Sequence, residues 1–373
     1  MSDVRASYLR FPGWTQPFWT WATGRALPHQ KPLIRHTWAS YTAVTLVVFL
    51  GGLALSAAAV SARFDLWGLA LVAGWVLTLQ GARTMILVIA HQALHRKYSG
   101  NRARDRFFGE LVTVLNVYNT FQEFKEEHFD NHHRRSVFAT VEDPPVQFLF
   151  RFGFLPSMTR NQLWRRTLVV FVLPRFYAVT IGGRVRSNLT TGTWRRAGFV
   201  LWAGLWLSLP FWLPHGTSVL LLAFVLPVIF FSQLSALLDR LGEHAWLTPS
   251  DPGYDNRFYT VPATSARYCG APVPERGLRL GRAAVAWAGW LLSFLLYHLP
   301  SRLMVIVGDL PNHDYHHRYP TTASWTTAAY ARQRDIDSGD YGPPYTEVWG
   351  MFRAVDGMFR TMSEVPRDGD LVG

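Results

Sequence analysis

The chain has almost no cysteine, since Cys269 is the only one in 373 residues. A single thiol excludes an internal disulfide, a thiolate-ligated zinc site and an iron–sulfur cluster built into the chain. Residues 1–38 also lack the short basic, apolar and small-residue pattern of a cleavable signal peptide. Acidic residues are few as well, with 25 Asp and Glu against 37 Lys and Arg. The chain is therefore basic and has no thiol-based cofactor site of its own.

Apolar residues, by contrast, are abundant and gathered into long runs. Hydrophobic residues make up 49% of the chain, and 16 of its residues are Trp. About 17–25 consecutive apolar residues are enough to cross a bilayer as a helix. Four runs with almost no charge approach or exceed that length: Ala39–Ala62, Leu66–Ala90, Ala197–Leu213 and Thr217–Leu238. Only residues 63–65 separate the first two runs and only 214–216 the last two, so each pair is predicted to form a hairpin.

The basic residues indicate on which side of the membrane the loops lie. Lys and Arg crowd the ends of the predicted spans, and loops with this feature stay in the cytoplasm. The residues concerned are Arg96, Lys97, Arg102, Arg184, Arg186, Arg195 and Arg196. The net charge of +12 is therefore attributed to topology, and no nucleic-acid partner is expected.

These observations predict an all-α membrane protein with four transmembrane helices in two hairpins, both termini in the cytoplasm and a cytoplasmic helical cap. The expected organisation is an interfacial N-terminal segment at 1–38, a membrane domain at 39–320 and a cytoplasmic tail at 321–373.

Three shorter apolar segments are not expected to cross the membrane. Phe107–Phe121 is too short, and Leu163–Ile181 is broken by Arg and Pro residues, so both are expected to lie at the interface. Ala283–Leu299 is nearly long enough to cross. A crossing there would carry the histidines that follow it to the opposite face, so this segment too is placed at the cytoplasmic interface.

Histidines cluster in three short windows at helical spacing. Spacings of three and four residues place side chains on one face of a helix, and imidazole is the commonest metal ligand in proteins. The windows contain His91 and His95, then His128, His132 and His133, and finally His313, His316 and His317. Each window is expected to present its rings on one helical face: His91 with His95, His128 with His132 and with His133 at the edge, and all three rings of the third window together.

His244 is a ninth candidate ligand. A helix from Leu66 reaches His91 after about 37 Å, and one from Thr217 reaches His244 after about 40 Å, so both are expected at one depth in the cytoplasm. Nine imidazoles exceed what one ion can bind, which favours two ions. Iron, zinc, copper and nickel all accept imidazole, so the spacing leaves the metal open. The other four histidines match no window and are not expected to bind a metal: His29, His36, His215 and His298.

Polar residues beside the windows are candidate hydrogen-bond acceptors that orient the ligands. They are Glu127, Asp130, Asn131, Glu243 and Asp314. Two other classes of protein also carry histidines in membranes. A metal-ion transporter would place them inside the spans, and a membrane haem protein would pair them across facing spans. Neither pattern fits clusters that follow the spans.

The three windows together resemble the integral-membrane fatty-acid desaturase and hydroxylase superfamily, which includes the membrane alkane hydroxylases. The window beginning at His313 reads His-Asp-Tyr-His-His-Arg-Tyr-Pro and is similar to the desaturase form His-Asn-Tyr-His-His-x-x-Pro. Val141–Pro144 resembles the Asp-Pro continuation of the second window, and the Glu-His at 243–244 resembles the alkane hydroxylases. The resemblance covers roughly residues 39–320.

This resemblance implies a di-iron enzyme that uses O2 to oxidise an unactivated C–H bond. Its iron ligands would be His91, His95, His128, His132, His133, His244, His313, His316 and His317. The third window favours desaturation of an acyl or other apolar chain, with hydroxylation as the alternative. No redox domain is present in the sequence, so a separate ferredoxin or small cytochrome with its reductase is expected as electron donor, in a bacterial inner membrane.

Overall fold

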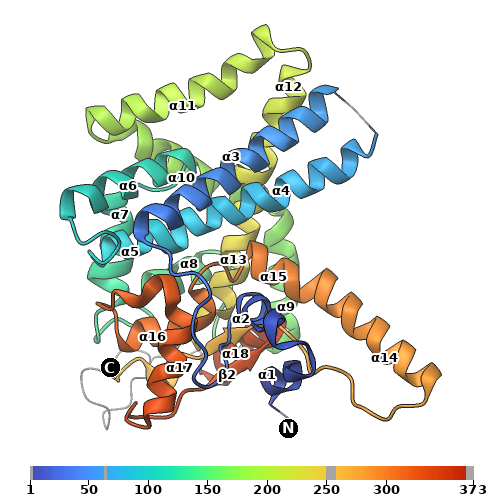
Figure 1. The fold of residues 1–373 in the computed structure, drawn as a ribbon. Coiled ribbons are helices and arrows are strands. Elements are labelled where there is room, and N and C mark those ends of the chain that lie inside the picture. The colour runs from blue at the N-terminus through green and yellow to red at the C-terminus, as the bar shows by residue number, and fades with distance from the viewer. Residues whose placement is uncertain (1–2, 63–64, 249–257, 367–373) are drawn as a thin grey trace.

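The computed structural model describes residues 3–62, 65–248 and 258–366, and this part of the chain is almost entirely helical (Figure 1). Two short strands, β1 (Ala266–Tyr268) and β2 (Glu347–Trp349), form a parallel pair. The predicted all-α character is therefore confirmed. The predicted linker at 63–65 falls mostly on residues 63–64, which lie outside the described part.

Helices α3 (Trp38–Ala62) and α4 (Trp67–Thr84) pack along one another because small residues let their backbones approach. A Cβ atom at Gly52 would lie 2.4 Å from the backbone nitrogen of Thr78, and one at Gly74 would lie 2.3 Å from the Ser56 hydroxyl. The helix of α4 continues through a π-helical segment, η3 (Met85–Ala90), into α5 (His91–Leu94). The first histidine window therefore stands at the end of a membrane helix.

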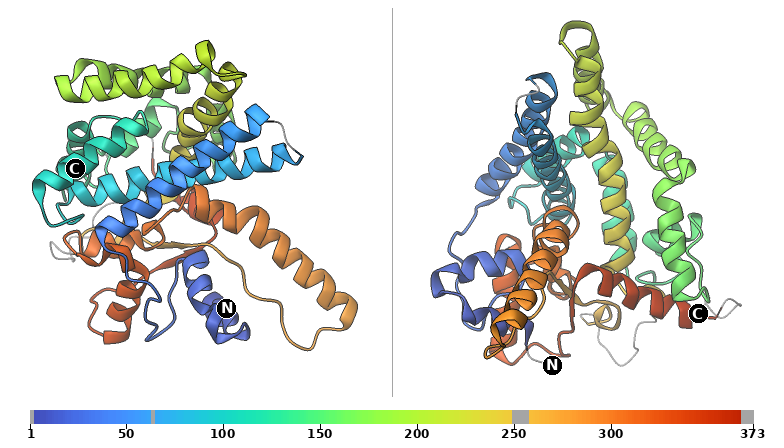
Figure 2. Two further views of the ribbon diagram at one scale, coloured as in Figure 1. Left: turned by 45° about the horizontal axis from the view of Figure 1, so that its top comes forward. Right: turned by 90° about the vertical axis from the view of Figure 1, so that its right-hand side faces the viewer.

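A second long helix approaches the same region from the other side of the molecule. It comprises α12 (Gly216–Val219), the π-helical η5 (Leu220–Phe231) and α13 (Ser232–Glu243), and Figure 2 shows it running down toward the C-terminal helix. The helix α11 (Thr193–Trp212) meets its upper end, where a Cβ at Gly216 would touch the Leu209 carbonyl. This long helix ends next to His244.

Four helices are long and apolar enough to cross a membrane: Trp38–Ala62, Trp67–Leu94, Gly216–Glu243 and Leu280–Met304. Their number agrees with the prediction of four, but their identity differs in one case. The predicted run Ala197–Leu213 forms α11, which is not among the four. The fourth is instead formed by α14 (Leu280–Ser293), η7 (Phe294–His298) and α15 (Leu299–Met304).

The helix that begins with α14 projects from the body of the protein (Figure 1). The segments before and after this helix lie close together. The Tyr268 hydroxyl in β1, which precedes the helix, lies 3.3 Å from Oδ1 of Asn312, which follows it just before the third histidine window. Apolar side chains along it, such as Val285 and Leu296, are three-quarters exposed at 74% each. An apolar helix with this exposure requires lipid around it.

The two shorter apolar segments that were not expected to cross are each broken. Phe107–Phe121 covers most of α6 (Arg102–Leu115) and the start of α7 (Phe121–Lys125), which begins with a capping box between Thr120 and Glu123. Leu163–Ile181 is divided between α9 (Arg160–Val172) and α10 (Pro174–Thr190), which meet at 61°. Proline cannot continue a helix from the preceding turn, so Pro174 fixes the bend.

The predicted cytoplasmic tail at 321–373 needs correction in its described part. The helix α18 (Met351–Glu364) buries Val355, Met358, Phe359 and Met362 along one face, against α13. This apolar stripe at helical spacing makes the segment part of the core. It was not recognised in the sequence because the surrounding residues are polar.

The N-terminal segment also packs on the body. Arg5 is fully buried and donates to Gln16 and Thr20, while Arg25 forms ion pairs with Asp3 and with Glu347 of β2. The remaining short elements are α1 (Val4–Ser7), η1 (Tyr8–Arg10), η2 (Gly13–Thr15), α2 (Gln16–Thr23), η4 (Glu126–His132), α8 (Pro144–Arg151), η6 (Val261–Ala263), η8 (Leu310–Asn312), α16 (His313–Arg318), η9 (Ser324–Thr327) and α17 (Ala328–Ser338).

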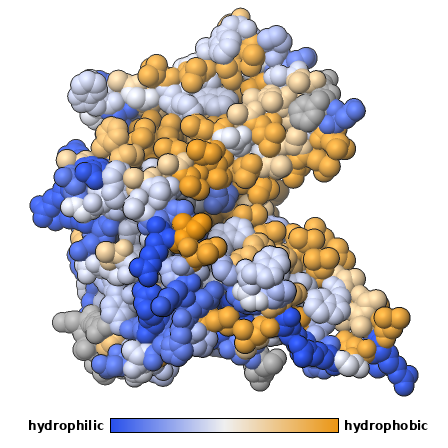
Figure 3. Space-filling view, viewed as in Figure 1, coloured by the Kyte–Doolittle hydropathy of each residue, from blue (hydrophilic) through white to orange (hydrophobic). Residues whose placement is uncertain are grey.

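The distribution of hydropathy separates two regions of the surface (Figure 3). Apolar residues cover the upper part, over α3, α4 and α12, and they continue along α14. Polar residues gather at the lower left, around the elements that carry the histidine windows. The long apolar helices therefore lead from a lipid-compatible region into a polar one.

Candidate metal centre

The first histidine window lies where the chain changes from a π-helix to an α-helix. The π-helical turn η3 precedes α5, and His91 and His95 follow it with only 5% and 4% of their surfaces exposed. The two rings meet edge to face with centroids 5.0 Å apart. Both histidines of this window lie in the same group of imidazoles.

The second window is itself π-helical, which corrects the expectation that His128 and His132 share a face. In η4 the ring of His128 turns toward His133, five residues on, and their Nε2 atoms are 3.1 Å apart. The ring of His132 lies 5.2 Å from that of His128, but its ligand atoms group with those of His244 and His317, whose rings are 5.1 and 5.4 Å away. A π-helix bonds residues five apart, so the neighbour of residue i becomes i+5 instead of i+4.

The third window forms the short helix α16 and is also divided. His313 and His317 face each other with 3.1 Å between their Nε2 atoms. His316 turns toward His91 and His95, with ring centroids 4.4 and 4.5 Å away. The three histidines of α16 therefore belong to two separate groups of imidazoles: His316 to one, and His313 and His317 to the other.

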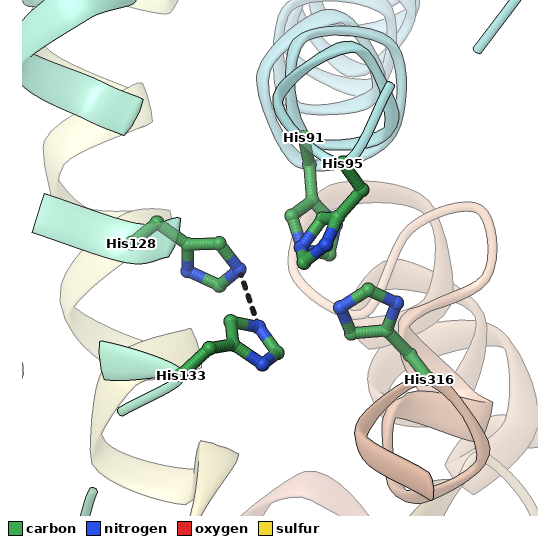
Figure 4. Close-up of side chains that lie close together, drawn as sticks. All are labelled: His91, His95, His128, His133 and His316. Atoms are coloured by element: carbon green, nitrogen blue, oxygen red, sulfur yellow. Dashed lines mark hydrogen bonds between the residues drawn. The ribbon is translucent and has the colours of Figure 1, made fainter. Parts of the chain in front are cut away.

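All nine predicted ligands come together in two adjacent groups. Within each combination their ligand atoms lie within 4.8 Å of one another. The first group, drawn in Figure 4, consists of His91, His95, His128, His133 and His316. The second consists of His132, His244 and His317, and His244 also combines with Glu243 and His313. His133 and His317 stack at 4.6 Å, so the two groups touch.

Glu243 brings a carboxylate into the second group. Its Oε1 lies 3.1 Å from Nε2 of His313. Glu243 was expected to accept a hydrogen bond from a ligand, and its position also suits direct binding of a metal. His244 follows at the end of α13 and is 3% exposed.

Burial favours the neutral, metal-binding form of several of these imidazoles. Burial, followed by the neighbouring imidazoles of His313 and His132, lowers the pKa of His95 to about 3. Burial is also the main cause of the strongly lowered pKa values of His128, His133, His316 and His317, followed by the neighbouring histidines. The pKa of His244 is lowered well below its usual value by burial too.

Nitrogen atoms in both groups lack hydrogen-bond partners among the described residues. They are Nε2 of His91, both nitrogens of His95 and of His244, Nε2 of His316 and Nδ1 of His317. A buried polar atom without a partner is costly, and clusters of such atoms are rare in folded proteins. Converging unpaired imidazole nitrogens fit transition-metal ions, so this donor set suits the predicted metals.

One orienting residue was not predicted. The fully buried carboxylate of Asp143 lies 3.0 Å from Nδ1 of His132 and accepts a second hydrogen bond from the backbone nitrogen of Ala139. It fixes the ring so that Nε2 faces the group. The signal was present in the sequence, since Asp143 belongs to the Asp-Pro pair after the second window.

The other predicted acceptors have different partners. Glu127 pairs with Arg240, and Asp130 pairs with Lys125. Asn131 donates to the Glu126 carbonyl. Asp314 accepts from Arg332 at 2.9 Å, and both are almost completely buried. Asp314 therefore ties α16 to α17, and the other three stabilise the protein around the groups without touching them.

The histidines predicted not to be ligands lie outside both groups in the described part of the chain. His29 is exposed beside Asp337, and His36 lies at the ring of Tyr41. His215 begins α12. His298 is buried and stacks against Tyr297.

A cavity of about 60 Å³ opens onto the histidines. Its walls are apolar at Leu87, Phe124 and Leu310 and charged at Arg83 and Asp239. Asp239 lies between two buried arginines, at 2.8 Å from Arg83 and 2.9 Å from Arg267. The histidines therefore border a small space whose wall combines apolar side chains with fixed charges.

The fatty acid desaturase family model matches residues 67–349, about three quarters of the chain. No individual curated protein matches the chain significantly. The match spans all three histidine windows and His244, and it confirms the resemblance seen in the sequence. With its apolar helices and clustered imidazoles, the chain belongs to the fatty acid desaturase family and is a membrane oxidoreductase.

Proposed function

We propose that this protein is an O2-dependent desaturase of acyl or other apolar chains, with two irons bound by the nine histidines. The observation that carries the proposal is the division of these imidazoles into two touching groups. One group offers five rings, and beside it His132, His244 and His317 are linked through His244 to Glu243 and His313. Two such sites side by side suit a pair of ions better than one.

Each part of the site has a definite role in this proposal. Bound iron would supply activation of O2 and abstraction of hydrogen from an unactivated C–H bond. The protein holds the imidazoles neutral by burial, and Asp143 orients His132. Apolar walls at Leu87, Phe124 and Leu310 exclude water from the reacting carbon.

Desaturation is favoured over hydroxylation by the sequence of the third window, His313 to Pro320. Both reactions begin with the same hydrogen abstraction and differ in whether a second hydrogen is removed or oxygen is transferred. Hydroxylation of a lipid, an alkane or another hydrophobic molecule is the second candidate. The product distinguishes the two reactions: desaturation adds a double bond to the substrate, and hydroxylation adds an oxygen atom.

The membrane arrangement is also part of the proposal. The histidine groups and both termini would lie in the cytoplasm of a bacterium, and four helices would cross the inner membrane: α3, α4, α11 over the predicted run Ala197–Leu213, and the helix from Gly216 to Glu243. An even number of crossings returns both termini to the same side. The helix beginning at α14 would lie at the cytoplasmic interface, because the chain leaves from and returns to the third window. A crossing would also draw the charges of Glu275, Arg276 and Arg279 through the bilayer.

A separate electron donor completes the reaction. The basic residues that follow the first two windows offer a docking surface for an acidic ferredoxin or small cytochrome: Arg96, Lys97, Arg102, Arg104, Arg106, Arg134 and Arg135. Opposite charges on the partners would accelerate their encounter.

Metal analysis combined with lipid mass spectrometry tests the proposal. The purified protein is expected to carry close to two irons per chain, and cells that express it should accumulate an unsaturated lipid product. Replacing His132 and His133 by Ala removes one ligand from each group and should abolish both results. The matched control replaces His29 and His215, which lie outside the groups. One zinc per chain, unchanged by the first pair of replacements, would refute the di-iron proposal.

A further inference from the structure

A second cavity adjoins the pocket at the histidine groups. It has a volume of about 220 Å³ and lies between α10 and α13. Four residues line both spaces, namely Tyr118, Glu127, Ala236 and Arg240. A molecule in the second cavity is therefore a direct neighbour of the proposed metal centre.

This cavity carries an excess of positive charge. Arg151, Arg184 and Arg240 line it, and Glu127 is the only carboxylate among its described lining residues. Glu127 is already paired with Arg240 at 3.3 Å. Two guanidinium groups are thus left without a negative charge from the cavity wall.

Arg184 differs from the other arginines near the site. Arg83 and Arg267 share the carboxylate of Asp239, whereas no carboxylate in the described part of the chain lies within ion-pairing distance of Arg184. Its guanidinium lies over the ring of Tyr118 at 4.3 Å and is half-buried. Withdrawing a charge from water without a partner is unfavourable, so a ligand anion would stabilise this arrangement.

The rest of the cavity wall is partly apolar, with the polar side chains of Asn119, Thr180 and Gln233 among its lining. Phe148, Phe176, Val179 and Leu237 line it beside the arginines. An occupant that satisfies both parts of the wall has one negatively charged group attached to a hydrocarbon chain. Arginine can bind a carboxylate or a phosphate through two parallel hydrogen bonds.

We propose that this cavity binds the anionic end of the substrate, with Arg184 as its counter-ion. The substrate is then an amphiphile with a terminal carboxylate or phosphate, and its chain passes Tyr118 and Ala236 to reach the histidines. The inference rests on the proposed function, because it names the substrate class of the same site. It also places the oxidised carbon near the charged end of the chain, because the two cavities are adjacent.

Arg186 provides a matched control. It lies two residues from Arg184 on α10 and is exposed. Both arginines obey the rule that cytoplasmic segments are basic, so a purely topological role predicts the same result for both. Binding of an anion in the cavity predicts an effect at Arg184 alone.

Equilibrium binding to the full-length protein in phosphatidylcholine nanodiscs tests the proposal without requiring turnover. The probes are radiolabelled hexadecanoate, hexadecyl phosphate and hexadecanol, which share a chain and differ in the head group. The wild-type protein is expected to bind at least one of the two anions saturably and about tenfold or more tightly than hexadecanol. The stronger of the two anionic probes identifies the head-group chemistry.

The variants then locate the site. Arg184→Gln should lose about tenfold or more in affinity for the anion and leave hexadecanol unchanged, Arg184→Lys should recover part of the loss, and Arg186→Gln should bind like the wild type. Metal content and the unfolding midpoint are measured on each variant to show that the protein is intact. Equal binding of the anions by Arg184→Gln and the wild type would overturn the proposal, as would equal binding of hexadecanol and the anions. A protein that binds the anion but contains no iron would refute the proposed function and leave this inference standing.

Discussion

Replacing Asp143 by Asn is expected to weaken metal binding while preserving the fold. Both carboxylate oxygens lie 3.0 Å from Nδ1 of His132, and one of them also accepts from the backbone nitrogen of Ala139 at 2.7 Å. Asparagine has the same shape but only one acceptor oxygen. When that oxygen accepts from Ala139, the amide NH2 group faces His132 and competes with its Nδ1 proton.

The magnitude follows from the role of the carboxylate. A carboxylate that accepts from Nδ1 keeps the proton there, raises the basicity of Nε2 and holds the ring in place. Loss of such a partner typically costs about 10–100-fold in metal affinity, or about 1.4–2.8 kcal/mol. The Asp143 side chain is fully buried, so solvent cannot replace the lost charge.

A chelator titration measures this effect. The purified proteins are incubated with increasing chelator, and the concentration that removes half of the metal is compared between variants. Asp130→Asn is the matched control, because Asp130 lies in the same window but forms a solvent-exposed pair with Lys125. Asp143→Asn should lose metal at a chelator concentration at least about tenfold lower, and Asp130→Asn should behave like the wild type. Metal retention by Asp143→Asn within about twofold of the wild type would refute the reasoning.

Three further predictions concern pH, the electron donor and the core. Because burial holds the pKa values of His95, His128 and His316 below the unfolded value of about 6.5, the unfolded chain takes up protons first as the pH falls. Metal retention and folding stability should therefore be full above pH about 6.5 and decline below it, and constant metal content after dialysis at pH about 4.5 would contradict this. Changing Arg102, Arg104 and Arg106 to Glu should raise the donor concentration needed for half-maximal turnover and reduce its salt dependence, with iron content intact, and an unchanged donor titration would exclude docking there. Phe359→Ala, in a fully buried position of α18, should lower the free energy of unfolding by about 3–5 kcal/mol in a denaturant titration, whereas a loss below about 1 kcal/mol would show that α18 is not part of the core.

The sequence predicted the members of the site better than their arrangement. All three windows and His244 come together. The first window and His244 stand at the ends of helices whose lengths could be read from their apolar runs, whereas the second window follows the short helices α6 and α7. His29 and His215, which match no window, lie outside these groups in the described part of the chain. The grouping of these histidines could be predicted from residue types and spacings without knowing how the side chains pack.

Contacts between distant segments could not be predicted in the same way. Asp143 reaches His132 only because the turn from Arg134 to Asp143 folds back, and its neighbour Glu142 looks equally suitable in the sequence. The burial of α18 depends on α13, which lies more than a hundred residues earlier in the chain. The unpaired state of Arg184 likewise becomes visible only when every nearby carboxylate has been assigned to another arginine.

The division of the second window explains how one apparently regular motif can contribute to two groups of imidazoles. On an α-helix His128 and His132 would face the same ion and His133 would point away. The π-helical turn η4 instead joins His128 to His133 and frees His132 for the second group. A π-helical turn is less stable than an α-helical one and is found mostly at functional sites. In the proposed di-iron centre the reason is the pair of neighbouring groups, because two adjacent ions would need ligands that leave a single helix in two directions. The same need accounts for the opposite orientations of His316 and His317 on α16.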